Sequence, residues 1–182
     1  AISILITFIV LFFSKFLGFL LILISVWVYY FFRDPERFSI NDESYLVSPA
    51  DGLITDISEK SGPEELRLEN TTYTKVSVFM NVFNCHVNRI PTAGTIEEIY
   101  YKPGKFLNAS LDKAREENER NYFKLKSKKN NEEIIIVQIA GLIARRIVCE
   151  VEQGQELKQG DRIGMIRFGL SLIHISEPTR QL

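Results

Sequence analysis

Two residues of this chain have side chains suited to proton transfer near neutral pH. His86 is one of only two histidines, and it lies in the segment FMNVFNCHVNRIP, after an apolar run and before Pro91. Imidazole is the natural general acid or base at this pH. Asp51, in the segment SPADG, supplies a carboxylate of the kind that orients an imidazole and raises its basicity. The pair indicates acid–base chemistry, and a nucleophile is then needed as a third member.

Each of these residues also has a structural interpretation. A lone histidine is more often structural than catalytic, and Asp51-Gly52 is a frequent hairpin-turn pair. Cys85 and Cys149 lie far apart and in no metal-ligand spacing. The cysteines therefore indicate neither a zinc site nor a disulfide framework, and we expect no metal. The formal net charge of −1 argues against a nucleic-acid binder.

The first 32 residues are apolar or small except for one charge, Lys15. As one helix they would span about 48 Å, against a hydrocarbon core of about 30 Å, so either one tilted helix or two short segments turning at Ser14-Lys15 fits. The aromatic run WVYY followed by Arg33 and Arg37 is typical of a cytoplasmic membrane boundary. A cleaved signal peptide is disfavoured because the apolar run is long and no small-residue cleavage site follows it. We predict a membrane anchor at residues 1–32.

Strand patterns dominate the rest of the chain. The segment YLVSPADGLITDISEK predicts a strand, a turn at residues 49–52 and a second strand. NASLDKAREENER is the one place where we expect a helix or ordered loop, and KSKKNNEE has the composition of a hairpin tip. The patterns predict a mostly β, sandwich-like or barrel-like (α+β) domain, with further strands at KVSVFM, TIEEIYYK, NYFKLKSK, EEIIIVQIA and RRIVCEV.

One alternative function is a non-enzymatic one. The segment CEVEQGQELKQGDRIGMI resembles the turn-rich β sandwich of biotinyl and lipoyl carrier domains, which would make the chain a binding domain on a membrane anchor. A carrier of this type displays a lysine between small or Met residues at a hairpin tip, and the sequence has no E-x-M-K-M-type stretch. The shared pattern is better explained by shared sandwich geometry.

A set of motifs in order along the chain indicates an enzyme family. An apolar N-terminus runs into YYFFRDPER, followed by SPADG, FMNVFNCHVNRIP, GKFLNAS with EENERN, VQIAGLIARRI and GDRIGMIRFG. Over residues 20–169 this series resembles the phosphatidylserine decarboxylase proenzymes of the short-chain type. The resemblance rests on the ordered set, because a single motif such as SPADG is weak.

The resemblance implies an enzyme that makes its own cofactor. In this family the chain is cut between a glycine and a serine near the C-terminus, and the serine becomes a pyruvoyl group on the new N-terminus. Asp51 and His86 match the carboxylate and the base that such a serine needs. The pyruvoyl group then forms a Schiff base with phosphatidylserine and acts as an electron sink while carbon dioxide leaves, and His86 can return a proton. Arg89 stands where other branches of the family have a second histidine.

The processing point departs from the family pattern. Family members have a serine after the glycine, whereas Gly169 is here followed by Leu170. Residues 170–180, LSLIHISEPTR, back-translate with permitted codons to the adapter of a common transposase-based sequencing library. We therefore expect residues 33–169 to be the large-subunit part of the catalytic domain, and residues 170–182 to be a non-native tail without specific packing. The chain as written is then inactive. The alternative is a natural divergent tail in which Ser171 is the nucleophile.

The resemblance also implies partners. A phosphatidylserine headgroup carries a phosphate and a carboxylate, for which Arg89, Arg145 and Arg146 are candidate contacts; sheet-edge or membrane-facing charges are the structural alternative. The implied partners are the phospholipid membrane, the substrate phosphatidylserine and the missing small pyruvoyl subunit, with a homo-oligomer left open and no nucleic acid. The implied location is a bacterial cell membrane, with the catalytic domain on the cytoplasmic side.

Overall fold

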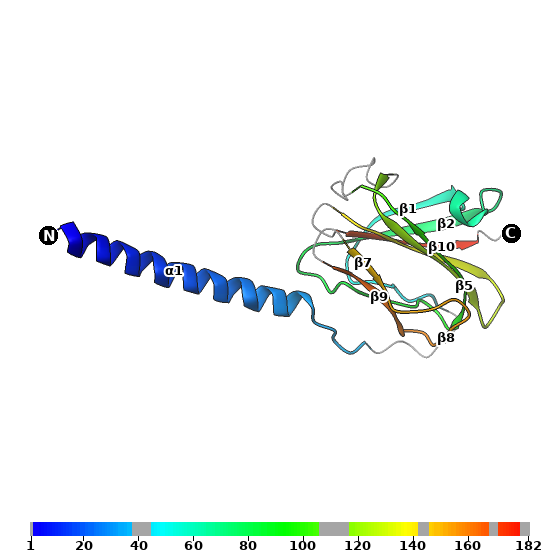
Figure 1. Cartoon of the computed structure of the whole chain (residues 1–182). Coiled ribbons are helices and arrows are strands. Elements are labelled where there is room, and N and C mark those ends of the chain that lie inside the picture. Colours follow the sequence, from blue (N-terminus) through cyan, green and yellow to red (C-terminus); the bar gives the residue numbers. More distant parts are fainter. Residues whose placement is uncertain (1, 38–44, 106–116, 142–145, 168–170, 179–182) are drawn as a thin grey trace. The chain divides into compact units, whose positions relative to one another are not determined.

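The computed structural model describes residues 2–37, 45–105, 117–141, 146–167 and 171–178 (Figure 1). The chain divides into two compact units, Ala1–Arg33 and Asp34–Leu182.

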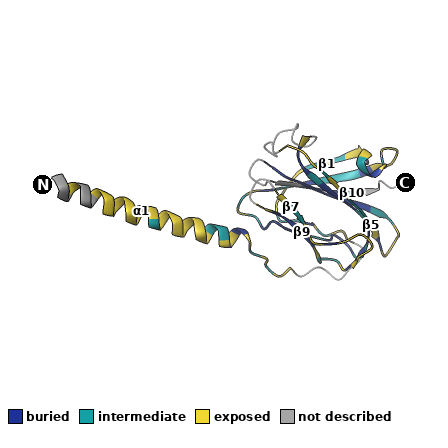
Figure 2. Cartoon of the chain, viewed as in Figure 1, coloured by how far each residue is buried: buried dark blue, intermediate teal, exposed yellow. Residues whose placement is uncertain are grey.

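The first unit is one continuous helix, α1 (Ile2–Phe31). The alternative of two segments turning at Ser14-Lys15 is therefore wrong. Residues Ile9–Phe31 have a mean hydropathy of 2.6, so by length and composition this stretch can cross a membrane. Its large apolar side chains are exposed almost throughout (Figure 2). Such a surface is stable in lipid but costly in water.

The second unit is a β sandwich, as the sequence patterns predict. The larger sheet has the strand order β1-β2-β10-β6-β5-β4-β8, and the smaller one has the order β3-β9-β7. Among the described strands both sheets are open, so the fold is a sandwich and not a closed barrel. The strands are β1 (Leu53–Ser61), β2 (Thr72–Met80), β3 (Val87–Arg89), β4 (Gly94–Lys102), β5 (Arg120–Ser127), β6 (Glu133–Ile139), β7 (Arg146–Cys149), β8 (Glu156–Leu157), β9 (Arg162–Arg167) and β10 (Ser171–Pro178), and a short 3-10 helix, η1 (Glu64–Leu66), follows β1.

The core lies between the two sheets and continues onto the outer face of the larger one. On β6, Ile134 and Ile136 belong to the main cluster, whereas Ile135 and Val137 belong to a second cluster on the other face. Leu66 of η1 is part of this second cluster. Because β6 is buried on both faces, its sequence is a continuous apolar run without the alternation of a half-exposed strand.

Two local predictions have different outcomes. The predicted strand before the SPADG turn is wrong, because residues 45–48 are irregular and their backbone bond is from Val47 N to Pro91 O, at 2.9 Å. Pro91 is one partner of this contact and Pro49 follows Val47 by two residues. Neither proline has the N–H group that a strand ladder needs. The helix or ordered loop predicted around residues 108–120 falls mostly on residues 106–116, which lie outside the described part.

The expectation of an unpacked tail is wrong for residues 171–178. They form β10, which pairs with β2 on one side and with β6 on the other. Ile173 and Ile175 are buried in the main core cluster. The physical reason is the sequence IHIS, whose alternation places β-branched side chains on one face and therefore suits a strand, whatever its origin. Burial of Ile173 and Ile175 counts against an adapter origin, which stays a prediction.

One glycine is required by the pairing of the smaller sheet. Gly164 of β9 lies opposite Asn88 and Cys149 and has φ +153°, and a Cβ at this position would lie 2.0 Å from Val148 O. We predict that Gly164→Ala destabilises the domain by more than about 3 kcal/mol, because backbone strain and a clash add.

The matched control is Gly154→Ala. Gly154 has φ +85° but open space where a Cβ would lie, so this substitution should cost only about 1–2 kcal/mol of strain. Chemical unfolding of both variants in detergent measures the difference. Equal costs would show that the close contact with Val148 does not matter.

Candidate active site

Asp51 lies on a segment that connects the two sheets. The carbonyl of Pro49 accepts a hydrogen bond from Arg89 N of β3, at 2.9 Å. Three residues later, the backbone of Gly52 is so close to β2 that a Cβ there would lie 2.4 Å from Phe79 O. Only glycine permits this approach. Asp51 is therefore held between β3 and the end of β2.

His86 lies where the chain crosses from β2 to β3. The crossing is a tight turn, closed by hydrogen bonds from Asn84 N to Asn81 O at 3.0 Å and from Asn81 N to Asn84 Oδ1 at 2.8 Å. His86 is fully buried, and its Nδ1 lies 3.1 Å from Asn84 O. Because a carbonyl can only accept, Nδ1 carries the proton in this contact, which leaves Nε2 as the basic nitrogen.

The strands on either side of the predicted processing point pair with the strands on either side of His86. The carbonyl of His86 accepts a hydrogen bond from Ile166 N of β9, at 3.2 Å. On the other sheet, Ser171 of β10 is the register partner of Met80 of β2. The predicted processing point, Gly169 and Leu170, belongs to residues 168–170, which lie outside the described part.

A cavity of about 270 Å³ adjoins Asp51. Cys85 and Val87, the two neighbours of His86 in the chain, line the same cavity. Its remaining lining residues are Pro35, Arg37, Val47, Ser48, Pro49, Ala50, Arg89 and Gly160. The structure therefore brings the Asp51 loop and the His86 segment to one pocket.

The partners of Asp51 and His86 differ from the predicted pair. Asp51 accepts a hydrogen bond from Arg37 Nη2, which also forms an ion pair with it. This hydrogen bond raises the pKa of Arg37 above its ordinary value, and the nearby Cys85 and Asp34 act in the same direction. The contact described for His86 Nδ1 is with a backbone carbonyl. Orientation of His86 by Asp51 stays a prediction.

The three arginines predicted for the headgroup lie in different places. Arg89 lines the pocket, but its guanidinium already donates to Gly160 O at 2.9 Å and to Asp34 Oδ1 at 2.5 Å. Arg146 is exposed at the start of β7, opposite Arg167. Arg145 lies outside the described residues. Sequence reasoning missed Asp34 as a site residue and took Arg37 as a membrane-boundary charge.

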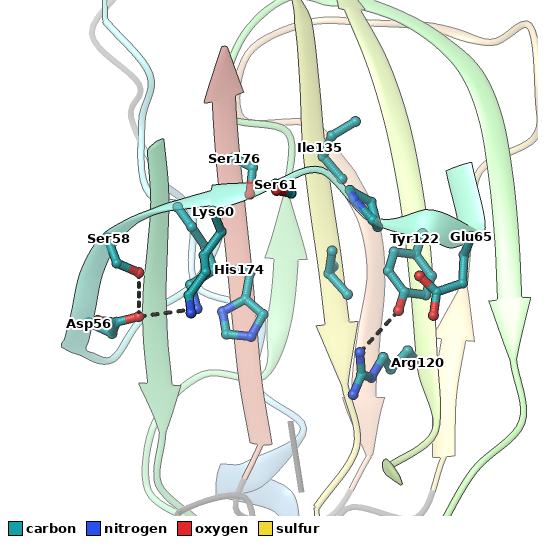
Figure 3. Close-up of a pocket in the computed structure, with 13 residues that line it drawn as sticks. Asp56, Ser58, Lys60, Ser61, Glu65, Arg120, Tyr122, Ile135, His174 and Ser176 are labelled. Carbon is teal, nitrogen blue, oxygen red and sulfur yellow. Dashed lines mark hydrogen bonds and ion pairs between the residues drawn. The ribbon is translucent and has the colours of Figure 1, made fainter. Parts of the chain in front are cut away.

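A larger cavity, of about 660 Å³, lies on the outer face of the larger sheet (Figure 3). Arg120 points toward Tyr122, and its Nη1 donates to the hydroxyl at 3.1 Å. Burial raises the pKa of Tyr122 to about 12; Arg120 opposes this shift and Glu65 reinforces it. Asp51 does not line this cavity but does line the smaller one, whose lining includes both chain neighbours of His86 and not His86 itself. We therefore place the candidate active site at the smaller pocket.

Comparisons with known proteins identify the family of the chain. The profile of the family described as phosphatidylserine decarboxylase matches residues 24–181. A phosphatidylserine decarboxylase proenzyme of Pelagibacter ubique is 64% identical over 169 residues, which are 93% of this chain and 78% of that protein. The proenzyme of Cereibacter sphaeroides is 52% identical, over 86% of this chain and 67% of that protein. The proenzyme of Rickettsia akari is 48% identical, over 91% and 71%.

The family match and the named relatives define the class of this protein as a decarboxylase. The chain belongs to the phosphatidylserine decarboxylase family. The alternative of a biotinyl-like or lipoyl-like carrier is not favoured.

The raised pKa of Tyr122 gives a test of the outer cavity. The folded pKa of about 12 exceeds the value of about 10 expected in an unfolded chain. Its contribution to stability is therefore full below about pH 10 and is lost as the pH rises toward about 12. Ultraviolet titration should show that Tyr122→Phe removes an ionisation step near pH 12. Loss of a step near pH 10 instead would contradict burial of this hydroxyl.

Proposed function

We propose that this chain is the membrane-anchored large part of a pyruvoyl-dependent phosphatidylserine decarboxylase. The enzyme would cut its own proenzyme between residues 169 and 170 and then convert phosphatidylserine to phosphatidylethanolamine. The observation that carries the proposal is the His86–Ile166 backbone bond, at 3.2 Å. It ties the buried histidine to the strand that ends two residues before Gly169, in a chain whose family is established.

The roles of the site residues follow from their positions. With a serine at position 170, Nε2 of His86 would accept the hydroxyl proton while the oxygen attacks the Gly169 carbonyl. The C–N bond then breaks, the amine takes up a proton, and an ester joins the two parts. Loss of the α-proton of residue 170 would expel the Gly169 carboxylate and separate the two chains, and hydrolysis of the resulting dehydroalanine would release ammonia and leave the pyruvoyl group. Asp51 would stabilise a protonated imidazole. The pyruvoyl group would supply an electron sink for the departing carboxylate.

The residue at the processing point does not fit this cofactor. Leu170 has no hydroxyl, so it can neither attack Gly169 nor become a pyruvoyl group. We therefore propose that the chain as written neither processes itself nor decarboxylates, and that residues 170–182 derive from a sequencing adapter. Ser171 is one position too late for the family pattern.

The remaining parts of the proposal concern the lipid. α1 would anchor the domain at the surface where its substrate is confined, with the positive residues after the aromatic run on the cytoplasmic side. Of the arginines proposed for the headgroup, Arg89 has the best position, because it lines the pocket. The pairing of two subunits from one proenzyme is part of the same proposal.

The first test is a single substitution, Leu170→Ser. Because β10 is already a central strand, no further change is needed to place a strand after the new Gly-Ser bond. We expect the chain to split into two parts on a denaturing gel. The smaller part should have a blocked N-terminus whose carbonyl is trapped by hydroxylamine or borohydride, and the unsubstituted chain should stay whole.

Two results would contradict this part of the proposal. One is self-cleavage of the unsubstituted chain. The other is a Leu170→Ser chain that unfolds with an unchanged midpoint yet never cleaves. Conversion of phosphatidylserine to phosphatidylethanolamine in vesicles, followed by thin-layer chromatography, then tests the decarboxylase activity itself.

The second test concerns the base. In the Leu170→Ser chain, His86→Ala should slow self-cleavage by about 10²- to 10⁴-fold, because the serine keeps its proton. The matched control is His174→Ala, since His174 lines the outer cavity and should leave the rate unchanged. Normal cleavage without His86, measured by the disappearance of the uncut band, would exclude it as the base.

A further inference from the structure

Residues 34–37 follow α1 closely and are tied to the β domain at both ends. We call these four residues the juxtamembrane strap. Two of them, Pro35 and Arg37, line the pocket that contains Asp51. The strap is thus a part of the pocket wall, although sequence patterns assign it to the membrane boundary.

Asp34 fixes the first end of the strap. Its Oδ1 accepts from Arg89 Nη2 at 2.5 Å, and its Oδ2 lies 3.0 Å from Arg162 Nε. Arg89 and Arg162 are register partners on β3 and β9, so their like charges face each other across the pair and would repel. One carboxylate between them removes this repulsion. The paired arginines on β3 and β9 therefore form a binding site for the Asp34 carboxylate.

Arg37 fixes the second end. It pairs with Asp51, and both side chains are partly exposed, 45% and 37%. An isolated exposed pair of this kind contributes little, about 0–1 kcal/mol. Here Asp34 already holds the strap, so less backbone freedom is lost when Arg37 meets Asp51. The pair is therefore better suited to orienting the carboxylate than to stabilising the fold.

We infer that the juxtamembrane strap is a working part of the active site, in which Asp34 and Arg37 are positioning residues that hold the pocket closed and orient Asp51. This inference deepens the proposed function and rests on it for its catalytic consequence. Arg89 then also holds Asp34 in place, beside its proposed role at the headgroup. The segment that leaves the membrane helix thus also completes the catalytic pocket.

The structural half of the inference is tested on the chain as written, through Cys85. This thiol is 5% exposed and lines the same pocket as the strap. With Cys149→Ser as background, Asp34→Asn or Arg37→Gln should raise the rate of Cys85 alkylation by a maleimide about tenfold, because the pocket wall opens more often. The assay requires no self-cleavage.

The matched control removes an ion pair elsewhere. Glu65→Gln breaks the contact between Lys102 Nζ and Glu65 Oε1, at 2.7 Å, on a different part of the domain. It should leave Cys85 alkylation unchanged. The inference would be wrong if alkylation were unchanged in the Asp34 and Arg37 variants. It would also be wrong if alkylation increased equally in these two variants and in Glu65→Gln.

The catalytic half is tested in the Leu170→Ser chain. Asp34→Asn should slow self-cleavage about tenfold, at a temperature well below the unfolding midpoint, and Asp34→Glu should restore part of the rate. Glu65→Gln should not change it. If alkylation rises but the Leu170→Ser chain never cleaves, the structural role of the strap is supported and the proposed function is wrong. If cleavage occurs and no strap variant alters either rate, the function stands and the strap is wrong.

Discussion

The register of two antiparallel strand pairs is the constraint on which the site depends. β3 pairs with β9 in the smaller sheet, and β2 pairs with β10 in the larger one. The chain passes from β2 to β3 and, later, from β9 to β10. Both ends of the first crossing are therefore paired with the strands that precede and follow the predicted processing point.

Charges around the pocket are arranged to preserve this geometry. A buried histidine needs a defined tautomer, and the Asn84 carbonyl supplies one by accepting from Nδ1. Two facing arginines need an anion, which Asp34 supplies from outside the sheet. Both are direct contacts between neighbouring groups. Each follows from placing a group that can only accept beside a group that donates.

The sequence predicts the sheet strands well where hydrophobic periodicity is strong. β2, β4, β5 and β6 fall on the expected segments because alternating or continuous β-branched runs suit few other structures. The same argument explains why β10 forms from a segment of suspected foreign origin. Periodicity says nothing of evolutionary origin, so Ile173 and Ile175 are buried regardless.

The site is predicted less completely than the fold. His86 and Asp51 are proposed from residue chemistry and family resemblance, because each is rare or lies in a recognisable motif, and their roles stay predictions. Asp34 and Arg37 are missed because their partners, Arg162 and Asp51, are distant in the sequence. Charged residues after an apolar helix are already explained by a membrane boundary. Their contacts with the β domain are seen only in the folded structure.

The central proposal, that the processing bond lies beside His86, has a direct test. A chain with His86→Cys and Leu170→Cys, and with Cys85→Ser and Cys149→Ser to remove other thiols, is exposed to a mild oxidant. A disulfide needs Cα atoms about 4.4–6.8 Å apart, and intact mass measured before and after alkylation reports whether it forms. The account predicts rapid formation with Leu170→Cys and none when the second cysteine is His174→Cys. Failure of the first pair to form in a folded chain would contradict the account.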